Sequence, residues 1–199
     1  MNTDIAPELC LKRREANRDG GGVKLMSGKA SVSKDELFRV LDLLDKTGIA
    51  YWLDGGWGVD ALVGRQTREH RDVDIDFDAA ATGALLRVLA QSGYTIETDQ
   101  SPVRIELHSD TLGYLDIHPF VLQSDGGARQ ANPEGGWWSF PARYFGETVF
   151  EGRAVRCISA AGQLAFHSGY ELRAVDRHDL ALLQSLLGAD ADGPDDPPD

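Results

Sequence analysis

Residues 72–77 read DVDIDF, with an acidic side chain at each even position and an apolar side chain at each odd position. This period of two predicts a half-buried β-strand, because successive side chains of a strand point to opposite faces. Asp72, Asp74 and Asp76 therefore share one face, with neighbouring Cα atoms about 6.6–6.8 Å apart. Each such pair of carboxylates repels by about 1 kcal/mol in water, and a protein offsets this repulsion with cations or uses it to bind metal.

A third carboxylate, Asp116, lies between two apolar residues in the sequence YLDI of residues 114–117, which also predicts a strand. An acid among apolar side chains is costly unless it has a partner. If the two strands are neighbours, Asp72, Asp74 and Asp116 converge. Such a cluster can hold two Mg²⁺ ions about 3.5–4 Å apart for in-line phosphoryl or nucleotidyl transfer.

A solvated strand face is the alternative interpretation of the acidic run, since charges on an exposed strand also protect against aggregation. Asp76 and Asp78 keep this interpretation. For Asp72 and Asp74 the presence of Asp116 favours the metal site.

Gly55 and Gly56 stand between a predicted strand at 51–53 and a short predicted helix at 57–63. Glycine lets the backbone approach a phosphate closely, and the N–H groups at a helix start favour an anion. An ordinary tight turn is the alternative. Neither a GxxxxGK[ST] loop nor a βαβαβ series follows, so a nucleotide bound here needs another architecture.

Residues 65–70, RQTREH, lie between the glycines and the acidic strand. Arg65, Arg68 and His70 can neutralise phosphate charge beside a metal–triphosphate site. A solvated loop is the alternative for this segment.

The remaining pattern predicts an α+β (or α/β) protein. Ser33 and Glu36 form a capping box for a helix that Gly48 ends. Further segments with helical spacing or with strand character surround the acidic strand: a helix at 82–91, paired strands at 103–107 and 114–117, a hairpin over 148–157, and helices at 160–171 and 176–187.

We expect a catalytic domain over residues 31–122 and a smaller, mainly helical substrate-binding region over 123–187. Residues 1–30 are expected to be a disordered or dispensable extension, and 188–199 a disordered acidic tail.

Composition narrows the class of partner. The 199 residues are 42% hydrophobic, enough for a full core, and carry a net charge of −12. The two ends contribute −5 and +2, which leaves −9 for residues 31–187. A body this acidic is a poor match for nucleic acid but suits a cationic small molecule or divalent metal. The two cysteines, and the absence of an apolar run of membrane or signal length, predict a cytoplasmic protein with no membrane partner.

These motifs together resemble a known family. Residues 52–62 (WLDGGWGVDAL), followed by Gly64, Arg65, Thr67, Arg68, His70 and the Asp-x-Asp strand, look like the lincosamide nucleotidyltransferases and the related aminoglycoside 2''-adenylyltransferases. Both belong to the polymerase-β-like nucleotidyltransferase superfamily, whose third acid is matched by LDI at 115–117. The likeness extends from about residue 33 to 187, with VRCIS at 155–159 and FHSGYEL at 166–172.

The resemblance implies a polymerase-β-like domain with a mixed sheet, and a role for each motif. Asp72 and Asp74 would bind both Mg²⁺ ions, and Asp116 would bind the metal at the acceptor and act as general base. The nucleotide, ATP or another NTP, would lie against the turn and loop residues Gly55, Gly56, Arg65, Thr67, Arg68 and His70. The reaction would join AMP to a hydroxyl of a small antibiotic and release pyrophosphate.

The acceptor is less specified. The resemblance favours a lincosamide, with His167, Tyr170 and Glu171 as acceptor contacts, whereas the acidic body permits an aminoglycoside or another metabolite. His167 is equally compatible with a hydrogen-bonded core histidine, and the aromatic residues at 137, 138 and 140 with either an apolar acceptor surface or the core. A phosphohydrolase and a non-catalytic nucleotide-binding or antitoxin-like module are further alternatives, and a homodimer is left open.

Overall fold

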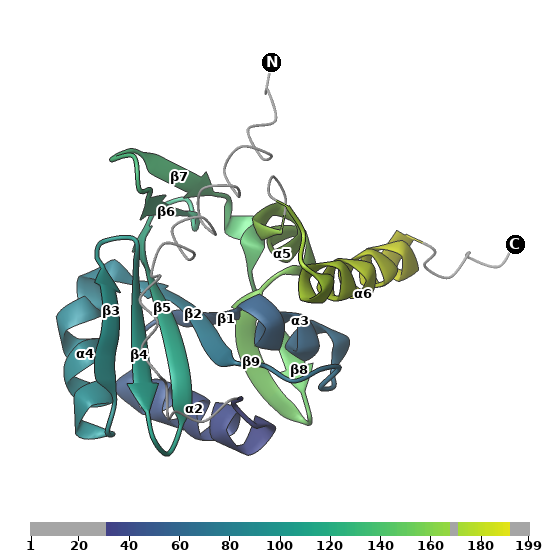
Figure 1. Ribbon diagram of the computed structural model, residues 1–199. Coiled ribbons are helices and arrows are strands. Elements are labelled where there is room, and N and C mark those ends of the chain that lie inside the picture. The colour runs from purple at the N-terminus through teal and green to yellow at the C-terminus, as the bar shows by residue number, and fades with distance from the viewer. Residues whose placement is uncertain (1–30, 168–170, 192–199) are drawn as a thin grey trace, which may run out of the picture.

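A mixed β-sheet forms the body of the computed structural model, which describes residues 31–167 and 171–191 (Figure 1). Seven strands follow in the order β3-β4-β5-β2-β1-β9-β8. In chain order, these are β1 (Tyr51–Asp54), β2 (Asp72–Asp78), β3 (Thr95–Gln100), β4 (Arg104–Ser109), β5 (Gly113–Leu122), β8 (Phe145–Phe150) and β9 (Arg153–Ile158). The pairs β2–β5 and β1–β9 are parallel, and the other pairs along this path are antiparallel. The expected α+β fold with a mixed sheet is confirmed.

The helix α2 (Lys34–Thr47) begins and ends as its sequence predicts. The Ser33 hydroxyl accepts from the backbone N–H of Glu36, whose carboxylate accepts from the backbone N–H of Ser33, and the left-handed Gly48 ends the helix at φ 67°. The apolar face of α2 is fully buried against the sheet. This face and that of α4 (Thr82–Gln91) form the main core together with the odd-numbered residues of β2.

The even-numbered residues of β2 point away from this core, because successive side chains of a strand alternate between its two faces. Three other helices pack together beside the sheet (Figure 1). These are α3 (Gly55–Val63), α5 (Ala160–Phe166) and α6 (Ala174–Ala191), which lie far apart in the sequence. Two short 3-10 helices, η1 (Ala79–Ala81) and η2 (Ala142–Tyr144), complete the helical elements of the described chain. None of its helices is both long and apolar enough to cross a bilayer.

The segment 123–187 contains more strand than the sequence indicates. The hairpin of β6 (Ala128–Ala131) and β7 (Trp137–Phe140) extends from the end of β5, and β8 and β9 join the main sheet beside β1. In this segment the α-helices begin only after Ser159, and the short η2 is the helical turn that precedes them in its described part. A second apolar cluster lies between this hairpin and α5; it contains Phe120, Ala128, Trp138, Phe140, Ile158 and Phe166.

The two last helices differ in length from their predictions. The predicted helix at 160–171 is α5, which ends at Phe166. The predicted helix at 176–187 is α6, which begins earlier, at Ala174. The Asp176 carboxylate accepts from the backbone N–H of Arg173, the residue before the helix, and this interaction stabilises the start of the helix there. It also continues to Ala191, so the first four residues of the predicted disordered tail are helical. Residues 192–199 and the predicted extension 1–30 lie outside the described residues.

Candidate active site

Three carboxylates converge on one face of the sheet because β2 and β5 are parallel neighbours. Their register places Asp74 opposite Asp116, so the condition on which the expected convergence depended is met. The ligand atoms of Asp74, Asp116 and His118 lie within 4.8 Å of one another, as do those of Asp72, Glu106 and Asp116. Asp116 therefore belongs to both groups.

Two arginines balance this negative charge. Arg104, only 5% exposed, donates from Nε to both oxygens of Asp116 at 3.0 Å and lies 2.8 Å from Oδ2 through Nη2. Arg71 is bound to Asp72 at 2.8 Å and also to Glu106. The cluster thus already holds cations at the carboxylate oxygens that a metal would use.

Burial also changes the protonation of these acids. Desolvation, together with the repulsion of Asp74 and Asp72, raises the pKa of Asp116 to about 8, although Arg104 opposes the shift. The pKa of Asp72 is raised as well, by burial and by Asp74, against the effect of Arg71. A carboxylate whose pKa lies near neutral pH suits a general base, because it releases and accepts protons readily at that pH.

The donor set fits Mg²⁺. The ion prefers oxygen ligands and uses one or two carboxylates together with substrate phosphates. Asp72, Asp74 and Asp116 offer such oxygens from adjacent strands. The raised pKa values of Asp72 and Asp116 indicate that these two carboxylates favour added positive charge. Asp76 is fully buried, so the interpretation of this residue as part of a solvent-exposed strand face is wrong. Asp78 is half-buried and caps η1 by accepting from the backbone N–H of Ala80.

The raised pKa of Asp116 makes the stability of the metal-free protein depend on pH. Between the ordinary value of 3.8 and about 8, the folded protein retains a proton that the unfolded chain has released. The free energy of unfolding therefore falls as the pH rises through this window, by up to about 1.4 kcal/mol per pH unit from this carboxyl. A cation at the cluster stabilises the carboxylate and offsets the loss.

We accordingly expect the melting temperature in EDTA to fall between pH 6 and pH 8.5, and Mg²⁺ to reduce that fall. Thermal denaturation at both pH values, with and without Mg²⁺, measures the effect. An equal fall in the presence and absence of Mg²⁺ would contradict it.

The Gly55-Gly56 turn lies directly against the acidic strand, as the start of α3. Gly55 has φ +59°, and a Cβ added there would be 2.2 Å from Oδ2 of Asp74. A Cβ on Gly56 would be 2.2 Å from Nη2 of Arg68 and 2.4 Å from Nδ1 of His70. Both positions therefore require glycine, because other groups approach them closely. Side-chain nitrogens of Arg68 and His70 converge over the start of a helix, where an anion is favoured.

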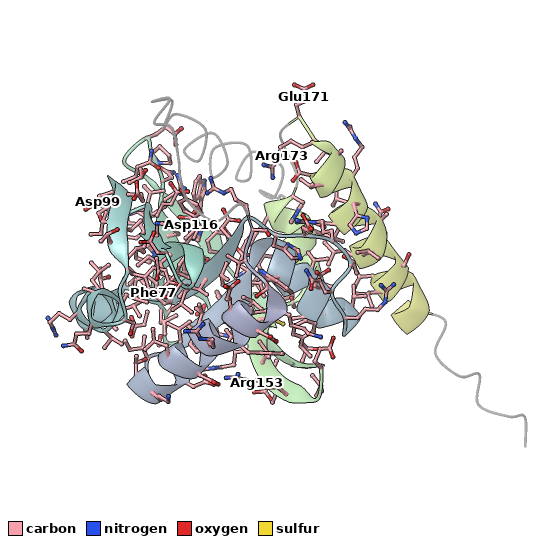
Figure 2. All side chains as sticks on the ribbon, turned by 60° about the horizontal axis from the view of Figure 1, so that its bottom comes forward. Phe77, Asp99, Asp116, Arg153, Glu171 and Arg173 are labelled. Carbon is pink, nitrogen blue, oxygen red and sulfur yellow. The ribbon has the colours of Figure 1, made fainter. Side chains whose placement is uncertain are left out.

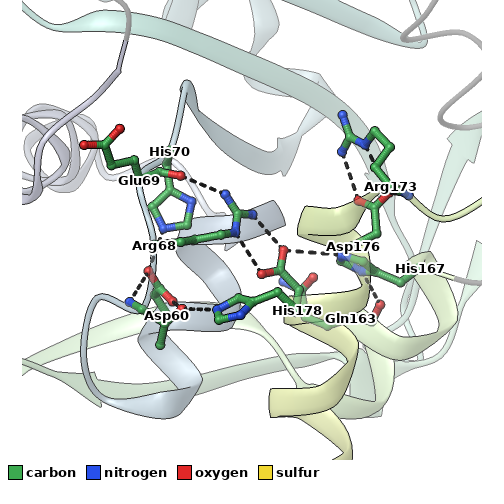
Figure 3. A network of polar contacts seen from close by, with 11 residues as sticks. Asp60, Arg68, Glu69, His70, Gln163, His167, Arg173, Asp176 and His178 are labelled. Atoms are coloured by element: carbon green, nitrogen blue, oxygen red, sulfur yellow. Dashed lines mark hydrogen bonds and ion pairs between the residues drawn. The ribbon is translucent and has the colours of Figure 1, made fainter.

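The loop that carries Arg68 and His70 is anchored to α3. The carboxylate of Asp60, which is fully buried, accepts from the backbone N–H and hydroxyl of Thr67 and from Nε2 of His70 at 2.6 Å. The Nδ1 side of His70 is thereby directed at the glycine turn. Arg68 is bound in turn by Asp179 from α6. Figure 3 shows Arg68 and His70 of this loop beside Asp60.

A cavity of about 380 Å³ joins the turn, the loop and the acidic strand. Of the predicted site residues, its walls include Gly55, Gly56, Arg68, His70, Asp72, Asp74 and His167. Asp116 is buried and is not among the residues that line the cavity, but its carboxylate lies within 4.8 Å of the ligand atoms of Asp74 and His118. The walls are completed by side chains from β1, β5, the loop and the last two helices: Asp54, Glu69, Arg71, His118, Phe166, Arg173, Val175, Asp176 and Asp179.

Other predicted residues are not brought to this cavity. Arg65 is exposed, and Thr67 supports the loop through Asp60 without lining the cavity. Glu171 is exposed and lies at the periphery, whereas Asp116 lies within the body of the molecule (Figure 2). Tyr170 lies outside the described residues.

The aromatic residues at 137, 138 and 140 do not line the cavity either. Trp138 and Phe140 are buried in the second apolar cluster, and Trp137 is 48% exposed with Arg129 stacked on its ring. His167 is both buried and cavity-lining; its Nδ1 donates to the carbonyl of Gln163 at 2.8 Å. The apolar wall of the cavity is instead formed by Phe166 and Val175.

Several residues at the site were not singled out by sequence reasoning. For His118 a signal existed, since it follows Asp116 by two positions and must share its face. For Arg104 the alternation VRIEL at 103–107 pointed to one polar face, without indicating what that face meets. For Asp179 the sequence offered no signal, because its partner Arg68 is 111 residues away.

The glycine turn packed against an Asp-x-Asp strand, with a third carboxylate on the next strand, defines a nucleotidyltransferase, and comparison with known proteins agrees. The family model for aminoglycoside-2''-adenylyltransferase matches residues 36–183. The chain therefore belongs to this family and is a nucleotidyltransferase.

The similar proteins include enzymes named for two classes of antibiotic. A lincosamide resistance protein from Staphylococcus haemolyticus is 50% identical over 156 residues, 78% of this chain and 97% of the relative. The lincomycin-bound structure of the lincosamide antibiotic adenylyltransferase LnuA is similar with a TM-score of 0.74 and 50% identity, covering 78% of this chain and 99% of LnuA. A 2''-aminoglycoside nucleotidyltransferase from Escherichia coli is 29% identical over 123 residues, 62% of this chain and 66% of the relative.

Proposed function

We propose that this protein transfers AMP from ATP to a hydroxyl of a lincosamide antibiotic and releases pyrophosphate. The observation that carries the proposal is the convergence of Asp72, Asp74 and Asp116 beside the glycine turn. The choice of acceptor is supported by 50% identity to a lincosamide resistance protein over nearly the whole of that relative.

In this reaction Asp116 would remove the proton from the acceptor hydroxyl. The hydroxyl oxygen then attacks the α-phosphorus of ATP, and the bond from that phosphorus to the bridging oxygen breaks as pyrophosphate leaves. Mg²⁺, held by Asp72, Asp74 and Asp116, would neutralise phosphate charge. Arg68, His70 and the N–H groups at the start of α3 would bind and orient the triphosphate.

The cavity supports an acceptor that has both an apolar and a cationic part. Phe166 and Val175 supply apolar surface, and Asp54 lies on the strand next to Asp74. A lincosamide has one amine and an apolar end, which suits such walls. An aminoglycoside, with several positive charges, is the second candidate, because aspartate and glutamate outnumber arginine among the residues that line the cavity. Cytoplasmic location, the exclusion of nucleic acid and a homodimer stay predictions.

Mass spectrometry of lincomycin, clindamycin and a panel of aminoglycosides, after incubation with the protein, Mg²⁺ and mixed nucleotides, tests the proposal. We expect lincomycin and clindamycin to gain the mass of one AMP, with pyrophosphate rather than orthophosphate released. The Asp72→Asn/Asp74→Asn variant should give no adduct. Adducts on aminoglycosides alone would overturn the choice of acceptor, and the absence of any adduct would send the search to other metabolites.

A further inference from the structure

Arg68 is held in place by a residue from the opposite end of the chain. Its Nε donates to Oδ1 of Asp179 at 2.9 Å and its Nη2 to Oδ2 at 2.7 Å, a bidentate arrangement that fixes the plane of the guanidinium. Asp179 is 1% exposed and lies in α6, whereas Arg68 lies in the loop before β2. Figure 3 shows Arg68 in a polar network that includes Asp60 of α3, Gln163 of α5 and His178 of α6.

Asp179 is itself well supported. His167 lies 3.9 Å from its Oδ2 through Nε2, and the other ring nitrogen of His167 donates to the Gln163 carbonyl. Burial alone would raise the pKa of Asp179, but the hydrogen bonds and the charge of Arg68, together with the nearby His167, lower it. The carboxylate is therefore ionised at neutral pH, and its two hydrogen bonds with Arg68 fix the guanidinium relative to α6.

The guanidinium held in this way faces the glycine turn. Nη2 of Arg68 lies over Gly56: a Cβ added to this glycine would be only 2.2 Å from that nitrogen. A guanidinium has five N–H donors. Two are used on Asp179 and one on the carbonyl of Glu69 at 3.0 Å, which leaves two N–H groups with no acceptor among the described residues. A phosphate above the turn can accept from them.

We propose that Asp179 is a positioning residue for nucleotide binding: by holding Arg68 over Gly56 it makes the C-terminal helix α6 part of the triphosphate site. This inference rests on the proposed function in taking ATP as the nucleotide, but it requires no particular acceptor. It assigns to α6 a role in nucleotide binding, for which the other proposed residues lie between Gly55 and Asp116 in the chain.

The direction in which nucleotide affinity changes when Asp179 is replaced distinguishes a positioning role from simple charge repulsion. Removing a negative charge beside a triphosphate should by itself strengthen nucleotide binding, because two like charges no longer repel. If Asp179 positions Arg68, its removal should weaken binding instead, because the freed arginine no longer presents its donors at the turn. An inhibitory contact, in which Asp179 competes with phosphate for Arg68, also predicts stronger binding after removal.

The test is calorimetric titration of Asp179→Asn with MgATP, without any acceptor. We expect the dissociation constant to rise roughly tenfold, as for loss of a charge-assisted contact. Asp179→Glu, which keeps a carboxylate, should recover most of the affinity. Asp110→Asn is the matched control, because it makes the same substitution at a side chain that is 95% exposed and does not line the cavity. This variant should bind MgATP as tightly as the wild type.

Arg68→Lys provides a second approach that avoids substituting a buried residue. It should lose about as much affinity as Asp179→Asn, and combining the two substitutions should cost little more than either alone. Unchanged or tighter MgATP binding by folded Asp179→Asn, or wild-type binding by Arg68→Lys, would overturn the inference. Wild-type protein that binds MgATP but modifies no lincosamide would count against the proposed acceptor alone.

Discussion

Replacement of Asp116 by asparagine is expected to lower the rate of nucleotidyl transfer by about 10²–10⁴-fold, the usual contribution of a general base. The amide cannot accept the proton of the acceptor hydroxyl, and it also provides a neutral ligand in both groups of converging side chains. Binding of MgATP should persist, because the glycine turn and the Arg68 loop are unchanged. Steady-state assays of pyrophosphate release, with calorimetry for MgATP, measure the two effects separately.

A control variant and a test of folding are needed to assign the loss of activity to the Asp116 carboxylate. Asp110→Asn removes a charge from the same β4–β5 hairpin at a side chain that is 95% exposed, and it should have wild-type activity. Because Asp116→Asn leaves the buried Arg104 with a neutral partner, circular dichroism and the melting temperature must show that the variant is folded. A folded Asp116→Asn protein with more than a tenth of the wild-type rate would refute the role of Asp116 as base.

Gly55→Ala is expected to reduce the transfer rate by about 100-fold, because a displacement of about 1 Å at reacting groups can cost that much. The new Cβ would be 2.2 Å from Oδ2 of Asp74, so this carboxylate or the turn must move. The left-handed conformation at φ +59° adds roughly 1–2 kcal/mol of backbone strain. The assay is the rate of pyrophosphate release at saturating MgATP and acceptor.

Gly64→Ala separates strain from displacement. Gly64 ends α3 with φ +82°, and a Cβ there would have no atom within 4 Å. This variant should lose similar stability but keep nearly wild-type activity. If both alanine variants lost activity equally, the contact with Asp74 would not be the cause.

Much of the fold was predictable because its signals lie within single elements. The Ser33–Glu36 capping box and Gly48 mark the two ends of α2, and the alternation of residues 72–77 marks β2. The meeting of this strand with Asp116 was also predictable, since an acid within an apolar strand needs a partner. The elements of the segment 123–187 were harder to predict, because the strands β6 and β7 are only four residues long and show little periodicity.

The surroundings of the carboxylates could not be predicted in the same way. The alternation of β2 assigned Asp76 to the acidic face, but burial of that face depends on what covers it, and Asp76 is fully buried. The pairing of Arg104 with Asp116 follows from the register of β4 on β5. A sequence pattern reports which residues share a face, and it does not report which element covers that face.

By itself the sequence determined the elements that carry the chemistry: an acidic strand, a glycine turn before a short helix, and a third acid on another strand. These follow from the periods of helix and strand and from the conformational freedom of glycine. Only the tertiary structure decided that Arg104 neutralises Asp116 and that Asp179 of α6 holds Arg68 over the turn. The physical reason is that such contacts depend on how distant elements pack, and this packing leaves no periodic trace along the chain.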